Sequence, residues 1–144
     1  MRGVSVETDL EIPDGYAPDT VSGFEQLIGP LYSRTPGTGE PTWGFRVEAA
    51  HVNGRQTCHG GMLTAFADLA WGKPLRTYGY DAGWATVRLT TDFLAPAPID
   101  SWVEAVSQVI GVDGDLFIVA GHLWTSDVTL MTGSALYKGY RKRS

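Results

Sequence analysis

One segment constrains the fold more than any other: residues 62–71 are apolar almost throughout. Ala, Leu and Met, which are strong helix formers, dominate the segment, and its only polar residues are Thr64 and Asp68. A helix with no continuous polar face is stable only when other elements cover it. The segment therefore predicts a central helix that is wrapped by the rest of the chain.

Alternating patterns elsewhere in the chain predict the elements that cover this helix. Trp43, Phe45 and Val47 alternate with glycine and charged residues, as in a half-buried strand. Similar segments run over about residues 84–94, 102–112, 115–124 and 129–141, with turn signals at Asp113-Gly114 and Ser126-Asp127. Strands that are joined by hairpins form an antiparallel sheet. We therefore predict an α+β fold in which five or six antiparallel strands surround one long helix.

The chain is predicted to form a single domain over its 144 residues. Proline and glycine recur in residues 1–20, which indicates an irregular lead-in. Ser22 with Glu25 three positions later matches a capping box, and predicts that a short helix begins there. Gly29-Pro30 should end that helix early.

Composition excludes several classes of function. The chain has 43% hydrophobic residues but no apolar run of the ~18 residues that a membrane span needs. Its net charge is −5, whereas a nucleic-acid-binding protein usually carries a basic face. The N-terminus does not resemble a signal peptide, and Cys58, as the single cysteine, has no partner for an internal disulfide. We therefore expect a cytoplasmic protein that binds neither membranes nor nucleic acids.

Asp68 is the first candidate for a functional residue. Thr64 and Asp68 are four residues apart, so they share one face of the predicted helix. A carboxylate in an apolar helix is costly unless it is paired or serves a function. Asp68 is either a structural residue that pairs with a basic side chain or caps a loop, or a carboxylate in an enclosed cleft. In the second case it is suited to act as a base or a nucleophile.

The start of the same helix carries the second candidate site. His59, Gly60 and Gly61 precede the apolar segment. The first N–H groups of a helix have no partner inside the helix and lie at the positive end of its dipole. Such N–H groups can stabilise the oxyanion of an acyl-transfer intermediate. The two glycines also suit a simple tight turn. Because a carboxylate follows two helical turns later at Asp68, we favour the oxyanion site.

Other polar residues near this segment allow further interpretations. Asn53 could hold a carbonyl or a water through its amide, or be a turn residue before Gly54. His51, His59 and Cys58 match no zinc-binding spacing, so we expect no metal. A nucleophilic Cys58 would need a general base, and the adjacent His59 is expected to point elsewhere.

These residues together resemble a known signature, that of the PaaI-like hotdog thioesterases within the 4-hydroxybenzoyl-CoA thioesterase superfamily. The matching positions are His51, Asn53, His59-Gly60-Gly61 and Asp68, and the spacing from His51 through Asp68 fits the signature without a gap. The resemblance extends over about residues 24–140 and includes the strand that leads to Pro96-Ala97. It implies a hotdog fold, homodimers or homotetramers, and hydrolysis of an acyl-CoA or another acyl thioester without a cofactor.

The resemblance also implies roles for individual residues. It makes Asp68 the nucleophile or general base and the Gly60 N–H the oxyanion donor. Asn53 and His59 would face the thioester from a partner subunit, and Thr86 would position water. The residues expected to contact the substrate are Gly61, Arg88 and His51.

One departure from the pattern leaves the carrier of the acyl group open. The hairpin around Asp113 and Asp115 is acidic where relatives often carry cations near the phosphates of coenzyme A. The carrier could instead be a pantetheine arm on a protein, or Arg88, Lys138 or the C-terminal basic residues could hold the phosphates. Two other functions stay open: a hotdog dehydratase or hydratase, and a protein that binds acyl thioesters without hydrolysing them.

Overall fold

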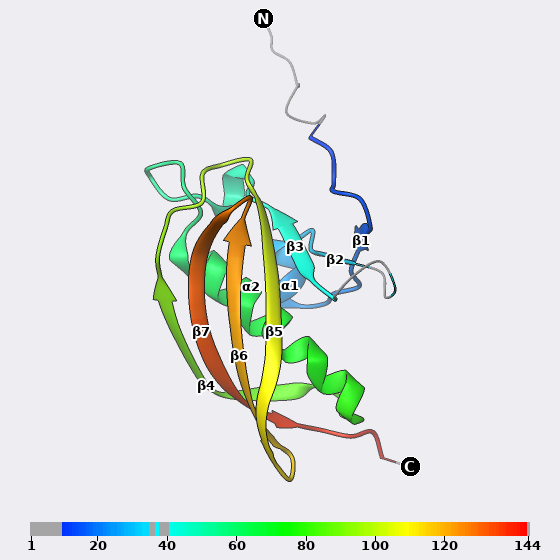
Figure 1. The fold of residues 1–144 in the computed structure, drawn as a ribbon. Helices are drawn as coiled ribbons and strands as arrows, with labels where there is room; N and C mark the ends of the chain where they lie inside the picture. The colour runs from blue at the N-terminus through cyan, green and yellow to red at the C-terminus, as the bar shows by residue number, and fades with distance from the viewer. Residues whose placement is uncertain (1–9, 35–36, 38–40, 144) are drawn as a thin grey trace, which may run out of the picture.

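The computed structural model describes residues 10–34, 37 and 41–143, and its elements follow the predicted order (Figure 1). The first nine residues of the predicted lead-in lie outside this description. In chain order the elements are β1 (Tyr16–Pro18), α1 (Phe24–Ile28), β2 (Tyr32–Arg34), β3 (Trp43–Arg46), the 3₁₀ turn η2 (Ala49–His51), α2 (Gly60–Gly72), the 3₁₀ helix η3 (Lys73–Tyr78), β4 (Trp84–Phe93), β5 (Trp102–Asp113), β6 (Leu116–Thr125) and β7 (Val128–Gly139).

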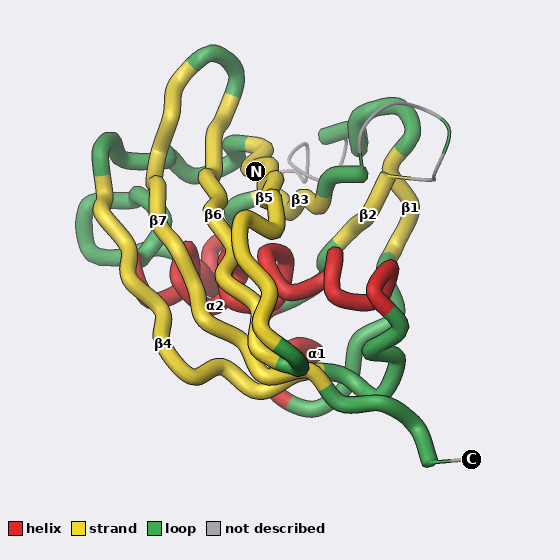
Figure 2. The backbone as a smooth tube through the Cα atoms, turned by 60° about the horizontal axis from the view of Figure 1, so that its bottom comes forward, coloured by secondary structure: helices red, strands yellow, loops and turns green. Residues whose placement is uncertain are grey.

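The strands form one antiparallel sheet that curves around α2 (Figures 1 and 2). Its order is β1-β2-β3-β5-β6-β7-β4. The predicted α+β hotdog fold, with one long helix inside an antiparallel sheet, is confirmed. The sheet has seven strands in place of five or six because β1 and β2 extend one edge. Each has only three residues, too few to produce a recognisable alternation.

The backbone angles at the turns agree with two of the predicted hairpins but not with the predicted start of the short helix. Gly114 and Ser126 adopt positive φ values of 63° and 49° in the two predicted hairpin turns. The predicted capping box at Ser22 is wrong. Gly23 occupies the N-cap of α1, and no side chain caps the helix. Gly23 has φ 61° and ψ −131°, so the chain turns one residue later than the Ser22 pattern required.

Trp71 sets the distance between α2 and the sheet. Gly121 on β6 and Gly133 on β7 lie opposite each other, and the indole of Trp71 packs against both. A Cβ atom at Gly121 would lie 2.5 Å from the indole, so a larger residue cannot be accommodated there without movement. The largest fully buried side chains of the core are Trp71, Tyr137, Phe45, Phe66, Phe117, Leu75, Leu123, Leu130 and Met131.

Helix α2 is covered on one side only by the residues that the structure describes, so its apolar sequence still requires further cover. One face packs into the sheet through residues such as Phe66 and Trp71. The opposite face is partly or fully exposed and carries Gly61, Thr64, Ala65, Asp68 and Leu69. We call these five residues the open face of α2.

The two edges of the sheet also differ in length and in exposure. The β1 edge is short, whereas β4 at the other edge has ten residues and, among the described strands, pairs with β7 alone. Val87 and Phe93 on β4 are exposed by 57% and 53%. Long apolar edge strands that lack a neighbour are sites where a further strand can add.

In the described residues, no helix combines the length and the hydropathy that a membrane crossing requires.

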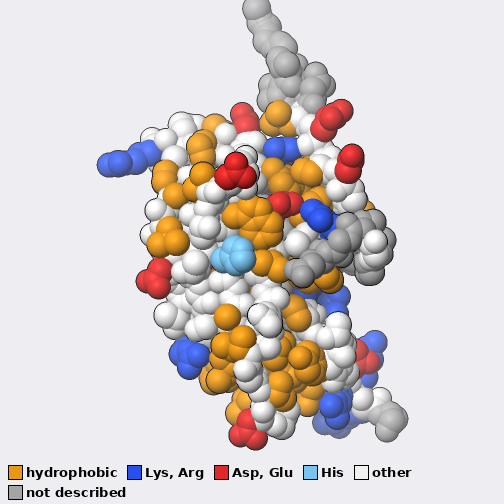
Figure 3. All heavy atoms as spheres, viewed as in Figure 1, with side chains coloured by type: hydrophobic (Ala, Val, Ile, Leu, Met, Phe, Trp, Pro, Cys, Tyr) orange, Lys and Arg blue, Asp and Glu red, His pale blue; other side chains and the backbone are white. Residues whose placement is uncertain are grey.

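The outer face of the sheet also carries exposed apolar side chains. Figure 3 shows them gathered at the end of the molecule near the β5–β6 hairpin. Ile110, Val112 and Ile118 are exposed by 60%, 53% and 40%. Patches of this kind are common at interfaces between proteins.

Candidate active site

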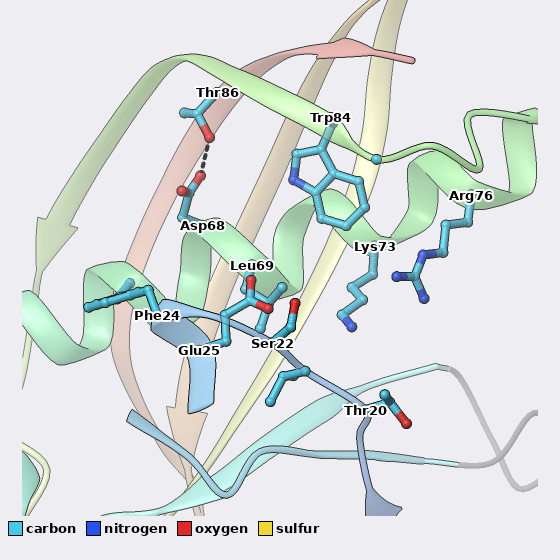
Figure 4. A pocket seen from close by; sticks show the side chains of 13 residues that line it. Thr20, Ser22, Phe24, Glu25, Asp68, Leu69, Lys73, Arg76, Trp84 and Thr86 are labelled. Carbon is cyan, nitrogen blue, oxygen red and sulfur yellow. Dashed lines mark hydrogen bonds between the residues drawn. The ribbon is translucent and has the colours of Figure 1, made fainter. Parts of the chain in front are cut away.

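Asp68 lies on the open face of α2 and is held in place by two strands. The Thr86 hydroxyl of β4 donates a 2.7 Å hydrogen bond to Asp68 Oδ1 (Figure 4). The Tyr137 hydroxyl of β7 donates a 2.8 Å bond to the main-chain carbonyl of Asp68. Burial, reinforced by the nearby Asp68 charge, raises the pKa of Tyr137, so this hydroxyl stays protonated. One carboxylate oxygen is thus fixed by Thr86.

A β-bulge directs Thr86 toward the helix. Thr86 pairs with the buried Tyr137, whereas Arg88 pairs with Leu136, so the register shifts at Val87. Paired residues in a ladder share a face, and the extra residue reverses the alternation. Thr86 therefore faces α2, and Arg88 lies on the outer face of the sheet. Within one chain the structure does not bring Arg88 to Asp68, although both were predicted to belong to the site.

The start of α2 has one free N–H group. His59 Nδ1 accepts a 2.7 Å hydrogen bond from the Gly61 N–H, and the His59 carbonyl accepts from Met62 and Leu63. The Gly60 N–H has no acceptor in the residues described. The amide of Gly60 is therefore available for an oxyanion, and that of Gly61, a predicted substrate contact, is already in use. Because its Nδ1 accepts this hydrogen bond, the neutral His59 ring carries its proton on Nε2 and can donate there.

The loop before α2 leaves a second donor free. Asn53 Oδ1 accepts hydrogen bonds from the Arg55 N–H at 2.8 Å and from the Thr57 N–H and hydroxyl at 3.2 Å. This Asx turn shapes the loop, as the alternative interpretation of Asn53 predicted. The carboxamide NH₂ has no acceptor in the part of the chain that is described, so Asn53 can also contact a ligand.

His51 has a structural role, which corrects its prediction as a substrate contact. It is buried, with 5% exposure. Its Nδ1 accepts a 3.0 Å bond from the Glu48 N–H, so Nε2 carries the proton and donates to the carbonyl of Ile28 at 2.6 Å. The His51 carbonyl also accepts from the His59 N–H at 2.8 Å. His51 thus ties α1 and the start of α2 together, and neither ring nitrogen is free for a ligand.

The free N–H of Gly60 and the carboxylate of Asp68 do not meet within one chain. They are eight residues apart on one helix, which corresponds to roughly 12 Å along its axis. Asp68 lies in an open hollow of about 500 Å³ with Thr86 and Trp84, whereas Gly60 lines a different hollow beside Phe93 and Leu94. A reacting carbonyl needs both groups within about 3 Å. Within one chain, the Gly60 N–H and the Asp68 carboxylate therefore cannot contact the same carbonyl group.

Other chemistries have less support from the geometry. The described residues contain no group of three His, Cys, Asp or Glu side chains that could hold a metal. Cys58 is buried, and its burial raises the pKa of the thiol to about 12. At neutral pH it is a protonated thiol, which is a poor nucleophile.

Comparison with known proteins agrees with this fold. Residues 55–132 match the thioesterase superfamily, and the chain belongs to that family. A Pseudomonas aeruginosa protein that is provisionally named an esterase is 23% identical over 130 residues, which cover 89% of this chain and 97% of that protein.

Two solved structures illustrate the likeness of the fold. The Escherichia coli PaaI protein of the phenylacetic acid degradation operon matches with a TM-score of 0.70 and 21% identity, over 82% of this chain and 86% of that one. A hypothetical thioesterase protein of Streptococcus pneumoniae, solved with coenzyme A, matches with a TM-score of 0.69 and 15% identity, over 88% and 99%. The predicted PaaI-like hotdog relationship is confirmed.

Tyr137 is a site residue that the sequence did not reveal. It occupies an inward position of β7, where an aromatic residue predicts only core packing. Its hydroxyl reaches the main chain of Asp68 because β7 crosses over α2 at this turn, and no local sequence pattern encodes that crossing.

Proposed function

We propose that this protein is an acyl-thioester hydrolase, with acyl-CoA as its substrate and Asp68 as the nucleophile or general base. The observation that carries the proposal is the arrangement on α2. A carboxylate with one oxygen fixed by Thr86 lies on the open face, and the same helix begins with an N–H that has no acceptor in the described chain. Both groups are needed to cleave a thioester, and membership of the thioesterase superfamily supports their use.

The complete site would form between two copies of the chain. If two β4 edges pair antiparallel about a two-fold axis, the start of one strand lies opposite the end of the other. Thr86, which holds Asp68, is near the start of β4, and Phe93 is at its end. A Cβ atom at Gly60 would lie 3.4 Å from the Phe93 ring, so Gly60 is next to that end. This pairing brings Asp68 of one copy toward Gly60 of the other.

The chemistry then follows from the groups present. The Gly60 N–H, with donors from Asn53 and His59, would hold the carbonyl oxygen as it becomes an oxyanion. Asp68 would either remove a proton from the attacking water or attack the carbonyl carbon itself, forming an anhydride that water hydrolyses. In both cases the C–S bond breaks, the acid gains the oxygen of water, and the thiolate takes up a proton.

Three features bear on the partners of the chain. The Streptococcus pneumoniae relative was solved with coenzyme A, which supports a coenzyme A thioester as the substrate here. Lys138 pairs with Asp115 at 3.0 Å, so the acidic hairpin is partly neutralised. The apolar outer face of the sheet would allow two dimers to associate as a homotetramer (Figure 3).

Gly60→Pro tests the oxyanion donor with little disturbance of the fold. Proline is tolerated at the first position of a helix, and His59 already has the φ of −61° and ψ of 137° that a residue before proline adopts. The substitution removes the N–H, whereas the control Gly60→Ala keeps it. We expect kcat for acyl-CoA hydrolysis to fall by about 10²-fold in the proline variant and much less in the alanine variant.

Mixing two inactive variants tests the shared site. A hybrid dimer of Asp68→Asn and Gly60→Pro chains contains one site with both groups intact and one site with neither. Co-refolding equal amounts of the two variants should place about half of the dimers in this hybrid form, and should therefore restore about a quarter of the wild-type activity per chain. If the mixture stays inactive, the site is not shared. If the wild type binds acyl-CoA but hydrolyses none, the protein is a binding protein and not a hydrolase.

A further inference from the structure

We propose that the hollow beside Asp68 binds acyl groups that end in a carboxylate, with Arg76 as the cation that receives it. This inference rests on the proposed thioesterase function and adds the chemical class of the acyl group. It starts from the opposite charges of the side chains at the two ends of the hollow (Figure 4). Asp68 and Thr86 lie at one end, and the side chains of Lys73 and Arg76 at the other.

The wall between the two ends carries both polar and apolar side chains. It is formed by α2, by β4, by α1 and by the segment that leads into α1. The polar lining residues are Thr20, Ser22 and Glu25, and the apolar ones are Val21, Phe24, Ala65, Leu69 and Trp84. An acyl chain whose carbonyl lies at Asp68 could therefore pack against these apolar side chains before it meets a basic end.

Arg76 is oriented and lacks a carboxylate partner. Its guanidinium lies 5.9 Å from the centre of the Trp84 ring, within the range of a cation–π contact. Trp84 packs closely against Gly72, where a Cβ atom would collide with the indole at 2.2 Å, so the ring is fixed. Arg76 forms no ion pair with any residue that the structure describes. A planar guanidinium with free donors matches a carboxylate in charge and shape.

The other charges near the hollow leave this role to Arg76. Lys73 is buried, and its ammonium pairs with Asp19 at 2.5 Å, so this pair is neutral as a unit. The pair also fastens the segment after Asp19 over α2, which forms the wall opposite Trp84. Glu25 of α1 lines the hollow as well and would oppose an anionic acyl group. Removing its charge should therefore strengthen the effect of Arg76.

The length of the hollow favours an acyl carboxylate over a phosphate of coenzyme A. Asp68 and Arg76 are eight residues apart, four of them in α2 and four in η3, which corresponds to roughly 14 Å along the helical path, and the arginine side chain spans part of that distance. A chain of a few carbons fills the remainder. The pantetheine arm has about thirteen bonds between its sulfur and the first phosphorus, roughly 16 Å when extended at ~1.2 Å per bond. An extended arm would carry the phosphate past Arg76.

The experiment compares hexanoyl-CoA with adipoyl-CoA, which has a terminal carboxylate on the same six-carbon chain. We expect the wild type to hydrolyse adipoyl-CoA with the higher kcat/KM. Arg76→Gln should lower kcat/KM for adipoyl-CoA by about tenfold and change that for hexanoyl-CoA by less than about twofold. Glu25→Gln should raise kcat/KM for adipoyl-CoA. The matched control is Arg143→Gln, because Arg143 is exposed and lies outside the hollow.

The outcomes separate this inference from the proposed function. If hexanoyl-CoA is hydrolysed but adipoyl-CoA is not preferred, and Arg76→Gln affects both equally, the inference is wrong and the thioesterase function stands. If no acyl thioester is hydrolysed, both are wrong. Repeating the assay with N-acetylcysteamine thioesters removes the phosphates. A loss in Arg76→Gln that occurs with both coenzyme A esters and disappears with N-acetylcysteamine would assign Arg76 to a phosphate and overturn the inference.

Discussion

The two faces of α2 are made from the same short segment but have opposite roles. The inner face packs Phe66 and Trp71 against the sheet, and both are essentially inaccessible to solvent. The open face carries Asp68 between small or medium side chains and contributes to the hollow. The inner face therefore fixes the position of the helix, and the open face is left free to contact a substrate or a second copy. Substitutions on the two faces should accordingly separate stability from activity.

Phe66→Ala should have the largest effect and break the inner face. Phe66 is 1% exposed and packs edge-on against Phe45, with ring centroids 4.7 Å apart. Removing such a side chain leaves a cavity, and we expect the free energy of unfolding to fall by about 3–5 kcal/mol. Urea denaturation measures this change. Thr64→Ala on the open face is the control and should cost less than about 1 kcal/mol.

Asp68→Asn should lower the activity and leave the stability almost unchanged. The amide oxygen can still accept the hydrogen bond from Thr86, but it cannot act as a base or nucleophile. We expect kcat/KM for acyl-CoA to fall by about 10²-fold, equivalent to about 2.7 kcal/mol, with an unfolding midpoint close to that of the wild type. A variant with wild-type turnover would show that Asp68 is not the catalytic carboxylate.

The sequence predicted the inner face better than the open face. Apolar periodicity reports burial, so the helix, the five longer strands and their turns were predicted within a few residues. The motif around Gly60 and Asp68 also identified polar residues that the fold places on the open side. Pairing across the sheet was not predictable, because it depends on contacts between distant residues. The bulge that turns Arg88 away from Thr86 and the bond from Tyr137 to Asp68 are two examples.

Substituting His51 tests whether this motif residue stabilises the buried core or contacts the substrate. His51→Phe keeps a ring but leaves the Glu48 N–H and the Ile28 carbonyl without their partner. We expect a loss of about 2 kcal/mol in unfolding free energy and less than a threefold change in KM at a temperature where the variant is folded. A rise in KM with unchanged stability would show that His51 contacts the substrate and is not mainly structural.

Cys58 is a buried thiol just before the open face, and its substitution should change stability the least. Because burial raises the pKa of its thiol from 9.0 to about 12, the folded protein keeps the proton at pH values where the unfolded chain releases it. The resulting stability is complete below pH 9 and is lost progressively as the pH rises toward 12. Between pH 8 and pH 10 the wild type should therefore lose about 1 kcal/mol more than Cys58→Ala. Chemical denaturation at the two pH values measures this difference. The variant should hydrolyse acyl-CoA like the wild type at pH 7, and a large loss of turnover there would assign the thiol a catalytic role.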